Sequence, residues 1–382
     1  MKNLRGILVA AVFLGLTALL KRLAVKYGLL MHVAYPFFSK TVQEILGSVT
    51  SGTAMCVWQV LLAVAIAAAV VSFALMILFR WNFFRWLGWI LAPVSVCMFL
   101  FTALWGLNYY NEPITTGMKL PVPDYTVEEL KNATRFYRQK ADELSTQVPR
   151  DTEGNVELAQ WDQMNQTLSQ AYDNLVMDYS IFSGSRGPVK QLGWSELFSR
   201  MGTTGVTVGL TGEAAVNMNA YSATIPFLMC HETAHLLAIA NEKEANFAAF
   251  LACQASEDPL FQYSGYLSAY LYCSNALSAA DPDAWTDIRA AASEQVRYDL
   301  KANQEIAEKY EGKLHDQAQS AYDEYQKSFG QEDGILTYGK VADYLVAWHL
   351  DQYVVSEAPP PTEFDPLNFD DVFGTEASEG GE

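Results

Sequence analysis

The residues best suited to chemistry lie within an apolar stretch, 226–237, that contains His231, Glu232 and His235. Histidines four residues apart lie on one face of an α-helix, so both rings can reach one metal ion. Glu232 lies beside that face, close enough to take a proton from a water molecule at the metal. This His-Glu-x-x-His spacing is typical of zinc metallopeptidases. The sequence therefore predicts a Zn²⁺ site with His231 and His235 as ligands and Glu232 as the catalytic base.

A third protein ligand is expected, because catalytic zinc sites usually have three and keep one position open for water. The nearby acidic candidates are Glu242 and Glu244. On a straight helix Glu242 would lie about 10 Å along the axis from His235, too far to share an ion. The chain must therefore turn back near Ala240 and Asn241. Asn241 suits either a left-handed helix end or the N-cap of a following helix.

We favour Glu242 as the third ligand, because Glu244 could instead close a capping box at the start of the next helix. Asn246, one turn after Glu242, could orient a histidine or be an ordinary surface residue. The longer metzincin pattern is absent, since it needs a glycine and a histidine where this chain has Ala238 and Asn241.

Other residues near the motif could assist catalysis. The Gly-rich stretch 201–222 predicts a strand or hairpin directly before the motif helix. Its backbone could pair with an extended peptide, whereas Glu213 and Asn217 within it are expected to be structural. Three of the 20 tyrosines are candidates for stabilising an oxyanion: Tyr221, Tyr263 and Tyr266.

The N-terminal part, residues 1–107, is apolar enough to be a membrane region. Segments 57–79 and 86–107 are each long enough to cross the hydrocarbon core, and 7–20 is a shorter apolar run between basic residues. Segment 25–46 is aromatic and partly amphipathic, as in helices that lie along the membrane interface. We expect about three transmembrane helices, at approximately 5–22, 57–79 and 86–107.

The basic residues around these segments give nearly balanced indications of orientation. Four place the N-terminus and the second loop inside, and so the following domain outside: Lys2, Arg5, Arg80 and Arg85. Four others oppose this orientation: Lys21, Arg22, Lys26 and Lys40. The short loop between Arg80 and Arg85, and the lack of basic residues just after the third span, favour an extracytoplasmic domain.

The rest of the chain is strongly acidic. Residues 1–107 contain eight basic residues and one acidic residue, which leaves 17 basic and 42 acidic residues in 108–382. This charge argues against nucleic acid as a partner. Residues 108–124 predict a linker, 125–355 show the apolar periodicity of amphipathic helices, and the acidic residues 356–382 predict a disordered tail.

Several further motifs follow one another in a specific order. They are Arg200-Met201-Gly202-Thr203-Thr204-Gly205, Gly212-Glu213-Ala214-Ala215-Val216-Asn217, His231-Glu232-Thr233-Ala234-His235, Glu242-Lys243-Glu244-Ala245-Asn246-Phe247 and Gly334-Ile335-Leu336-Thr337-Tyr338-Gly339. In this order, and with the apolar N-terminal segments, they resemble a bacterial membrane-protein family, domain of unknown function 3810. The resemblance covers most of the chain except the tail. It implies a membrane-anchored, zincin-like domain and brings no known substrate.

The segment that begins at Glu242 is also similar to the Glu-x-x-Ala-Asp/Asn segment of gluzincin peptidases, in which the first glutamate binds zinc. This resemblance again implies Glu242 as the ligand. One departure from the family is Ala238, where a glycine is common. Alanine makes a sharp left-handed reversal at that position more costly.

These patterns predict a mainly α protein, with N-terminal transmembrane helices followed by a predominantly helical zincin-like domain with a small β element. We expect a multi-pass protein of the bacterial cell membrane, with Zn²⁺ as cofactor and with lipid and nearby peptides or proteins as partners. The predicted activity is peptide-bond hydrolysis by a zinc-activated water, with Glu232 as base. A second hypothesis is zinc-dependent hydrolysis of another amide, such as a cell-wall peptide. The alternative is a non-catalytic membrane protein whose structural zinc site serves an interaction or sensor module. Glu232 argues against this alternative, because a structural site needs ligands but no base.

Overall fold

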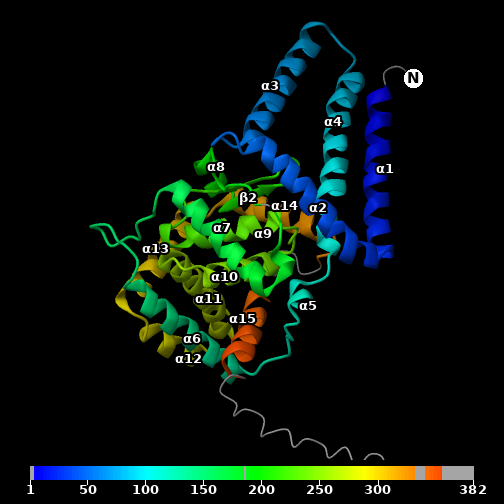
Figure 1. The fold of residues 1–382 in the computed structure, drawn as a ribbon. Helices are drawn as coiled ribbons and strands as arrows, with labels where there is room; N and C mark the ends of the chain where they lie inside the picture. The colour runs from blue at the N-terminus through cyan, green and yellow to red at the C-terminus, as the bar shows by residue number, and fades with distance from the viewer. Residues whose placement is uncertain (1–3, 185, 332–339, 355–382) are drawn as a thin grey trace, which may run out of the picture.

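In the computed structural model, three long apolar helices project from a mostly helical domain that contains one small sheet (Figure 1). This arrangement confirms the predicted fold class of N-terminal apolar helices followed by a mainly helical domain with a small β element. The structure describes residues 4–184, 186–331 and 340–354. The predicted tail at 356–382 and the motif at 334–339 lie outside these residues.

The three projecting helices are α1 (Arg5–Lys26), α3 (Val57–Leu78) and α4 (Phe83–Leu104), and each is long and apolar enough to cross a membrane. They coincide with the three apolar segments expected at 5–22, 57–79 and 86–107, although α1 continues to Lys26 and α4 begins three residues before the predicted position. Helices α1 and α4 run parallel and in close contact, since Gly6 lies against Gly88 and the Phe13 and Phe99 rings are 5.5 Å apart. Helices α3 and α4 form a hairpin. The ends of α1 and α4 and the start of α3 therefore lie on one side, where the domain begins (Figure 1).

Helix α2 (Gly28–Thr50) connects α1 to α3 and lies between the projecting helices and the domain (Figure 1). Its buried residues are spaced four apart and face the rest of the protein: Met31, Tyr35, Ser39, Gln43 and Gly47. The Gln43 side chain donates a hydrogen bond to the Gly209 carbonyl (3.1 Å), and the Thr50 hydroxyl donates one to Thr211 (3.2 Å). These contacts attach α2 to the turn that precedes the motif helix.

The stretch expected as a linker, 108–124, contains part of a 3-10 helix, Gly106–Tyr110, and the short helix α5 (Ile114–Met118). Ile114 and Met118 are buried in the main core, so this stretch packs against the domain. Helix α6 (Val127–Ser145) follows. Thr126 and Glu129 form its capping box, in which each side chain accepts a hydrogen bond from the backbone of the other residue.

The sheet has three short strands in the order β1-β3-β2: β1 (Lys190–Gln191), β2 (Gly205–Val208) and β3 (Glu213–Val216). Strands β2 and β3 form the antiparallel hairpin predicted from the Gly-rich stretch, with Val206 opposite Ala215. Helix α8 (Ser195–Arg200) connects β1 to β2. Strand β1 pairs in parallel with β3, and no sequence pattern indicated it.

The remaining helices build the core around the motif helix, α9 (Ile225–Leu236). Four of them contribute most of the buried apolar residues around it: α7 (Trp161–Asp178), α10 (Glu242–Ala255), α11 (Pro259–Ala280) and α15 (Val341–His349). The chain also contains short 3-10 helices at Ser180–Phe182 and Ser222–Thr224, and a π-helical turn at Leu350–Val354. Three further helices enclose the sides of the domain: α12 (Pro282–Ala290), α13 (Glu294–Tyr310) and α14 (Lys313–Lys327).

A buried ion pair attaches the membrane region to the sheet. The Glu213 carboxylate, on β3, accepts hydrogen bonds from the Lys190 ammonium (2.7 Å) and from the backbone N–H groups of Val57 (2.8 Å) and Trp58 (3.0 Å). Lys190 also donates to the carbonyl of Thr50 (2.8 Å). A carboxylate at a helix N-terminus stabilises the first turn, so Glu213 fixes the start of span α3. Glu213 is structural, as expected.

Candidate metal centre

The motif helix α9 is buried along nearly its whole length, between the β2–β3 hairpin on one side and helices α10 and α11 on the other. His231, Glu232 and His235 are all buried. Charged or polar groups in such an environment need partners, since each one left unpaired costs about 1–3 kcal/mol. The partners that these three residues have define the site.

A tight reversal after α9 brings the third acidic residue to the histidines. The N–H of Ile239 donates to the Ala234 carbonyl (3.2 Å) and that of Ala238 donates to the His235 carbonyl (3.2 Å), which is the Schellman pattern of a helix end. Ala238 has a φ of 67°. The reversal thus begins at Ala238, before the predicted position at Ala240 and Asn241.

Asn241 is the N-cap of α10, one of the two roles expected for it. Its side-chain oxygen accepts hydrogen bonds from the N–H groups of Lys243 (3.0 Å) and Glu244 (3.4 Å). Glu242 is therefore the first residue of α10, and its side chain turns towards α9. The carboxylate of Glu244 accepts a hydrogen bond from the backbone of Ile114 instead of closing a capping box.

The side chains of His231, His235 and Glu242 converge, as the choice of Glu242 as third ligand predicted. The two Nε2 atoms are 3.1 Å apart, and the Glu242 oxygens lie 3.2 Å from His231 Nε2 and 3.8 Å from His235 Nε2. Zinc ligands at 2.0–2.1 Å in tetrahedral geometry are about 3.3 Å from one another. The His235 Nδ1 lies 2.7 Å from the Ile239 carbonyl and donates to it, which leaves Nε2 as a lone-pair donor. Two imidazoles and one carboxylate thus fit a divalent ion such as Zn²⁺.

The two carboxylates of the site titrate in opposite directions. Burial favours the neutral form of Glu242, but His235, His231 and the hydroxyl of Tyr322 outweigh it and lower the pKa of Glu242 to about 2. Burial is the main influence on Glu232 and raises its pKa to about 7, against the opposing effects of His235 and Thr207. At neutral pH Glu242 is therefore an anion ready to bind a cation, and Glu232 can exchange a proton.

Strand β2 holds Glu232 in place. The Thr207 hydroxyl lies 2.7 Å from Glu232 Oε2 and 2.9 Å from the Glu232 carbonyl oxygen. A Cβ atom at Gly205 would lie 2.2 Å from Glu232 Oε1, so only a glycine leaves room for the carboxylate. The motif alone gave no indication of Thr207.

A tyrosine from a distant helix completes the group. The hydroxyl of Tyr322, on α14, is hydrogen-bonded to Glu242 Oε1. The three tyrosines named from the sequence lie away from the candidate ligands. Tyr221 and Tyr263 are hydrogen-bonded to Asp299, and Tyr266 is hydrogen-bonded to Gln254. Asn246 lines the cleft described below without a hydrogen bond from its Nδ2 to any described residue.

The site opens into a cleft of about 750 Å³ between the membrane region and α14. Phe101 on α4, and Trp105 and Tyr109 just after it, form one wall. The Trp105 indole N–H donates a hydrogen bond to the His235 carbonyl (3.0 Å). Other lining residues come from the hairpin, α9 and α14: Gly205, Val206, Thr207, Phe227, Leu228, Gln319, Tyr322 and Tyr325. Aromatic and apolar residues form much of the lining, and polar residues outside the candidate ligands, such as Thr203, Thr204 and Gln319, also line the cleft.

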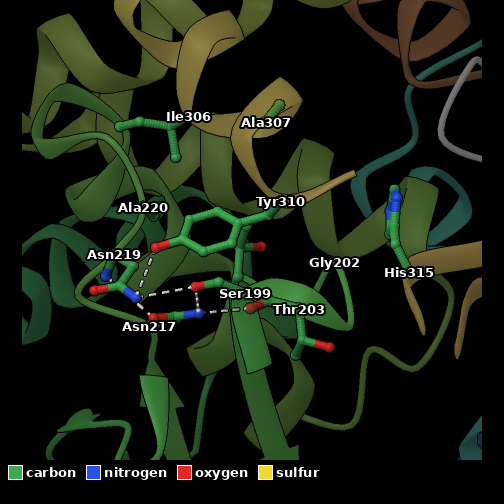
Figure 2. Close-up of a pocket in the computed structure, with 11 residues that line it drawn as sticks. Ser199, Gly202, Thr203, Asn217, Asn219, Ala220, Ile306, Ala307, Tyr310 and His315 are labelled. Carbon is green, nitrogen blue, oxygen red and sulfur yellow. Dashed lines mark hydrogen bonds between the residues drawn. The ribbon is translucent and has the colours of Figure 1, made fainter. Parts of the chain in front are cut away.

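A smaller pocket of about 150 Å³ adjoins the cleft, and Gly202, Thr203 and Thr204 line both. Figure 2 shows the side chains of Asn217 and Asn219 turned towards the Ser199 hydroxyl, with the Tyr310 hydroxyl above them. The amide nitrogen of Asn219 donates to Ser199 and Tyr310 (both 3.2 Å), and that of Asn217 donates to Ser199 (2.9 Å). The polar groups of this pocket come from Ser199 on α8, Asn217 and Asn219 after β3 and Tyr310 on α13, and His315 also lines the pocket. Asn217 is structural, as expected.

Comparison with known proteins identifies the family. A family model described as protein of unknown function DUF3810 matches residues 31–346. The chain belongs to the DUF3810 family. The match extends from α2 into α15, so it includes two of the three spans and every residue of the candidate site. No curated protein and no solved structure matches the chain.

Replacing Ala238 with glycine is expected to stabilise this DUF3810 protein. The left-handed conformation costs an alanine about 1–2 kcal/mol, and part of this is offset by the greater flexibility of glycine in the unfolded chain. We expect a net gain of about 0.5–1 kcal/mol and a slightly higher unfolding temperature for the full chain in detergent. Ala240→Gly, at a buried position without a positive φ, should lower that temperature. A lower temperature for Ala238→Gly would contradict the geometry of the reversal.

Metal analysis of the full chain will test the ligand set. After exposure to Zn²⁺ and removal of excess metal, we expect about one ion per chain in the wild type. Glu242→Ala should weaken zinc binding by more than the 10- to 100-fold that loss of an outer-shell partner causes. Glu244→Ala is the matched control and should retain the ion. Loss of zinc from Glu244→Ala together with retention by Glu242→Ala would exclude the proposed ligand set.

Proposed function

We propose that this protein is a membrane-anchored zinc metallopeptidase that hydrolyses peptide bonds in polypeptides near the membrane. The observation that carries the proposal is Glu232, a buried carboxylate beside the three candidate ligands that is not itself part of the ligand set. Its pKa of about 7 suits a group that must both accept and release a proton near neutral pH. A zinc site that only stabilised the fold would need no such residue.

Three polar residues around the candidate ligands would have roles in this reaction: Glu232, Thr207 and Tyr322. A divalent ion held by His231, His235 and Glu242 would supply a polarised substrate carbonyl and a water of lowered pKa. Glu232, oriented by Thr207, would take the proton from the attacking water and pass it to the leaving amine. Tyr322 would release its hydrogen bond to Glu242 Oε1 and donate its hydroxyl proton instead to the oxygen that becomes negative in the transition state.

The free edge of β2 offers a binding position for an extended substrate. The Asn217 N–H donates to the Thr204 carbonyl (2.8 Å), so this pair is a hydrogen-bonded pair of the hairpin. Because such pairs alternate along an antiparallel ladder, the backbone groups of Gly205 and Thr207 point away from β3. Both residues line the cleft, so a peptide could add to the sheet there with its scissile bond near Glu232. The adjoining smaller pocket would receive a substrate side chain.

The proposed location is the bacterial cell membrane, with the domain on the extracytoplasmic side. Three spans place the N-terminus and the domain on opposite sides of the bilayer. The short loop between α3 and α4, which contains Arg80, lies on the side of the N-terminus. Arg5, at the start of α1, lies on the same side as Arg80, and these basic residues favour the cytoplasm for that side.

The decisive experiment measures zinc content and turnover together in the full chain. We expect the wild type to cleave members of a broad quenched-fluorescent peptide library. Glu232→Gln should bind as much zinc as the wild type but lose at least about 10³-fold in turnover, because the reaction then lacks its base. Glu244→Gln removes a nearby carboxylate outside the cleft and should keep the wild-type rate.

Two outcomes would contradict the proposal. One is a wild type that binds zinc and cleaves no peptide in the library, which would favour a structural site in an interaction or sensor module. The other is undiminished turnover by Glu232→Gln.

Tyr322→Phe tests the proposed oxyanion donor. Removal of the hydroxyl should lower kcat by about 10²-fold with little change in KM, because the bond to the oxyanion forms only in the transition state. Because the hydroxyl also donates to Glu242, zinc should bind up to about 10- to 100-fold more weakly, so turnover is compared at saturating Zn²⁺. Tyr298→Phe, which removes an exposed hydroxyl outside the cleft, should have no effect. An unchanged kcat in Tyr322→Phe would exclude this role.

A further inference from the structure

Helix α2 has an apolar side that no described part of the chain covers. Five large apolar residues on it are mostly exposed: Leu29 (79%), Val33 (69%), Phe37 (76%), Ile45 (59%) and Val49 (78%). Neighbours in this series are four or eight residues apart, so they follow one side of the helix. A soluble helix normally has polar residues on its outer face, whereas this row of the outer face is apolar except for Thr41, whose hydroxyl donates to the Phe37 carbonyl (2.9 Å).

Several polar residues of α2 face the protein instead, whereas His32, Thr41, Glu44 and Ser48 are exposed. The Ser39 hydroxyl donates to the Leu104 carbonyl (3.2 Å), and the Lys40 ammonium donates to the Ser183 carbonyl (2.8 Å). Gln43 is bonded to Gly209, as described above. The inner side of α2 is therefore fixed to the ends of the spans and to the domain, and the helix cannot turn its apolar side inward.

The topology excludes a membrane crossing by α2. One residue separates α2 from the end of α1, and six residues separate it from the start of α3. The end of α1 and the start of α3 lie on the same side of the hydrophobic region, so α2 connects two points on one surface. Lys40 and Glu44 within α2 would also be costly inside the hydrocarbon core.

We propose that α2 lies along the membrane surface, with its apolar side inserted into the lipid leaflet on the domain side. Lipid is the expected occupant because the apolar side is continuous with the exposed apolar surfaces of α1 and α3. Trp194, the N-cap of α8, and Leu197, in the first turn of α8, are also exposed. Helix α8 lies beside the start of α3 (Figure 1). Tryptophan at that level is typical of a membrane interface. This inference is independent of the proposed activity.

The position of α2 determines where the cleft at the candidate metal site lies relative to the membrane. The inner side of α2 contacts the β2–β3 turn through Gly209, Thr211 and Gly212. Strand β2, which ends at Val208, lines the cleft. Insertion of α2 into the leaflet therefore holds the cleft beside the lipid surface.

Spin-label depth measurements on the full chain in vesicles of phosphatidylcholine and phosphatidylglycerol will test this proposal. Single cysteines replace Val33, Phe37, Ile45 or Val49 in a Cys97→Ala background, because the other four native cysteines are buried. Accessibility to oxygen, which concentrates in lipid, is compared with accessibility to a water-soluble nickel complex. Ile66→Cys, exposed in the middle of α3, gives the deep reference, and Ala290→Cys, on α12 at the far end of the domain, gives the aqueous reference (Figure 1).

We expect all four α2 labels to show oxygen-to-nickel ratios between the two references and similar to one another. Three results would overturn the proposal. Ratios equal to that of Ala290→Cys would place the apolar side of α2 in water. Ratios that change steadily from Val33 to Val49 would indicate a crossing helix. Labels shielded from both reagents would show that protein, a second copy of the chain or another partner, covers this side.

Discussion

Three polar side chains that could not be buried separately, His231, His235 and Glu242, define the centre of this protein. Two imidazole nitrogens 3.1 Å apart and a carboxylate within 3.8 Å place several lone pairs in one small buried volume. A bound cation would balance such a group, whereas a buried charge without a partner is destabilising. The same requirement explains the tight reversal after α9. Only a chain that turns back at Ala238 can bring the first residue of α10 to the last turns of α9, and the protein tolerates an alanine in a left-handed conformation to do so.

The sequence revealed the parts of the site that depend on local geometry. The spacing of His231 and His235 determines a shared helix face, Asn241 caps the next helix, and the Gly-rich stretch forms a hairpin. The three long apolar helices were equally accessible, because each is one continuous apolar segment of the chain.

The parts that the sequence did not reveal depend on tertiary packing. Tyr322 reaches Glu242 across 80 positions of the chain, and nothing in its own neighbourhood distinguishes it from the other tyrosines. Strand β1 is two residues long and its partner comes 25 residues later, so no periodicity could indicate it. Trp105 falls within the predicted span 86–107, and nothing in that segment indicated that its indole N–H donates to the motif helix. The reversal was expected two residues too late because Ala238 lacks the glycine that usually marks such a turn.

The membrane region and the domain are built as one unit. Glu213 and Lys190 connect the start of α3 to the sheet, α2 buries one side against the hairpin, and residues at the end of α4 form a wall of the cleft. A fragment from which α1 to α4 have been removed would therefore lack part of the wall of the cleft. It would also expose the buried Glu213 carboxylate. Crystallisation or screening of this protein therefore requires expression of the domain together with α1 to α4, and detergent or nanodiscs from the first purification step.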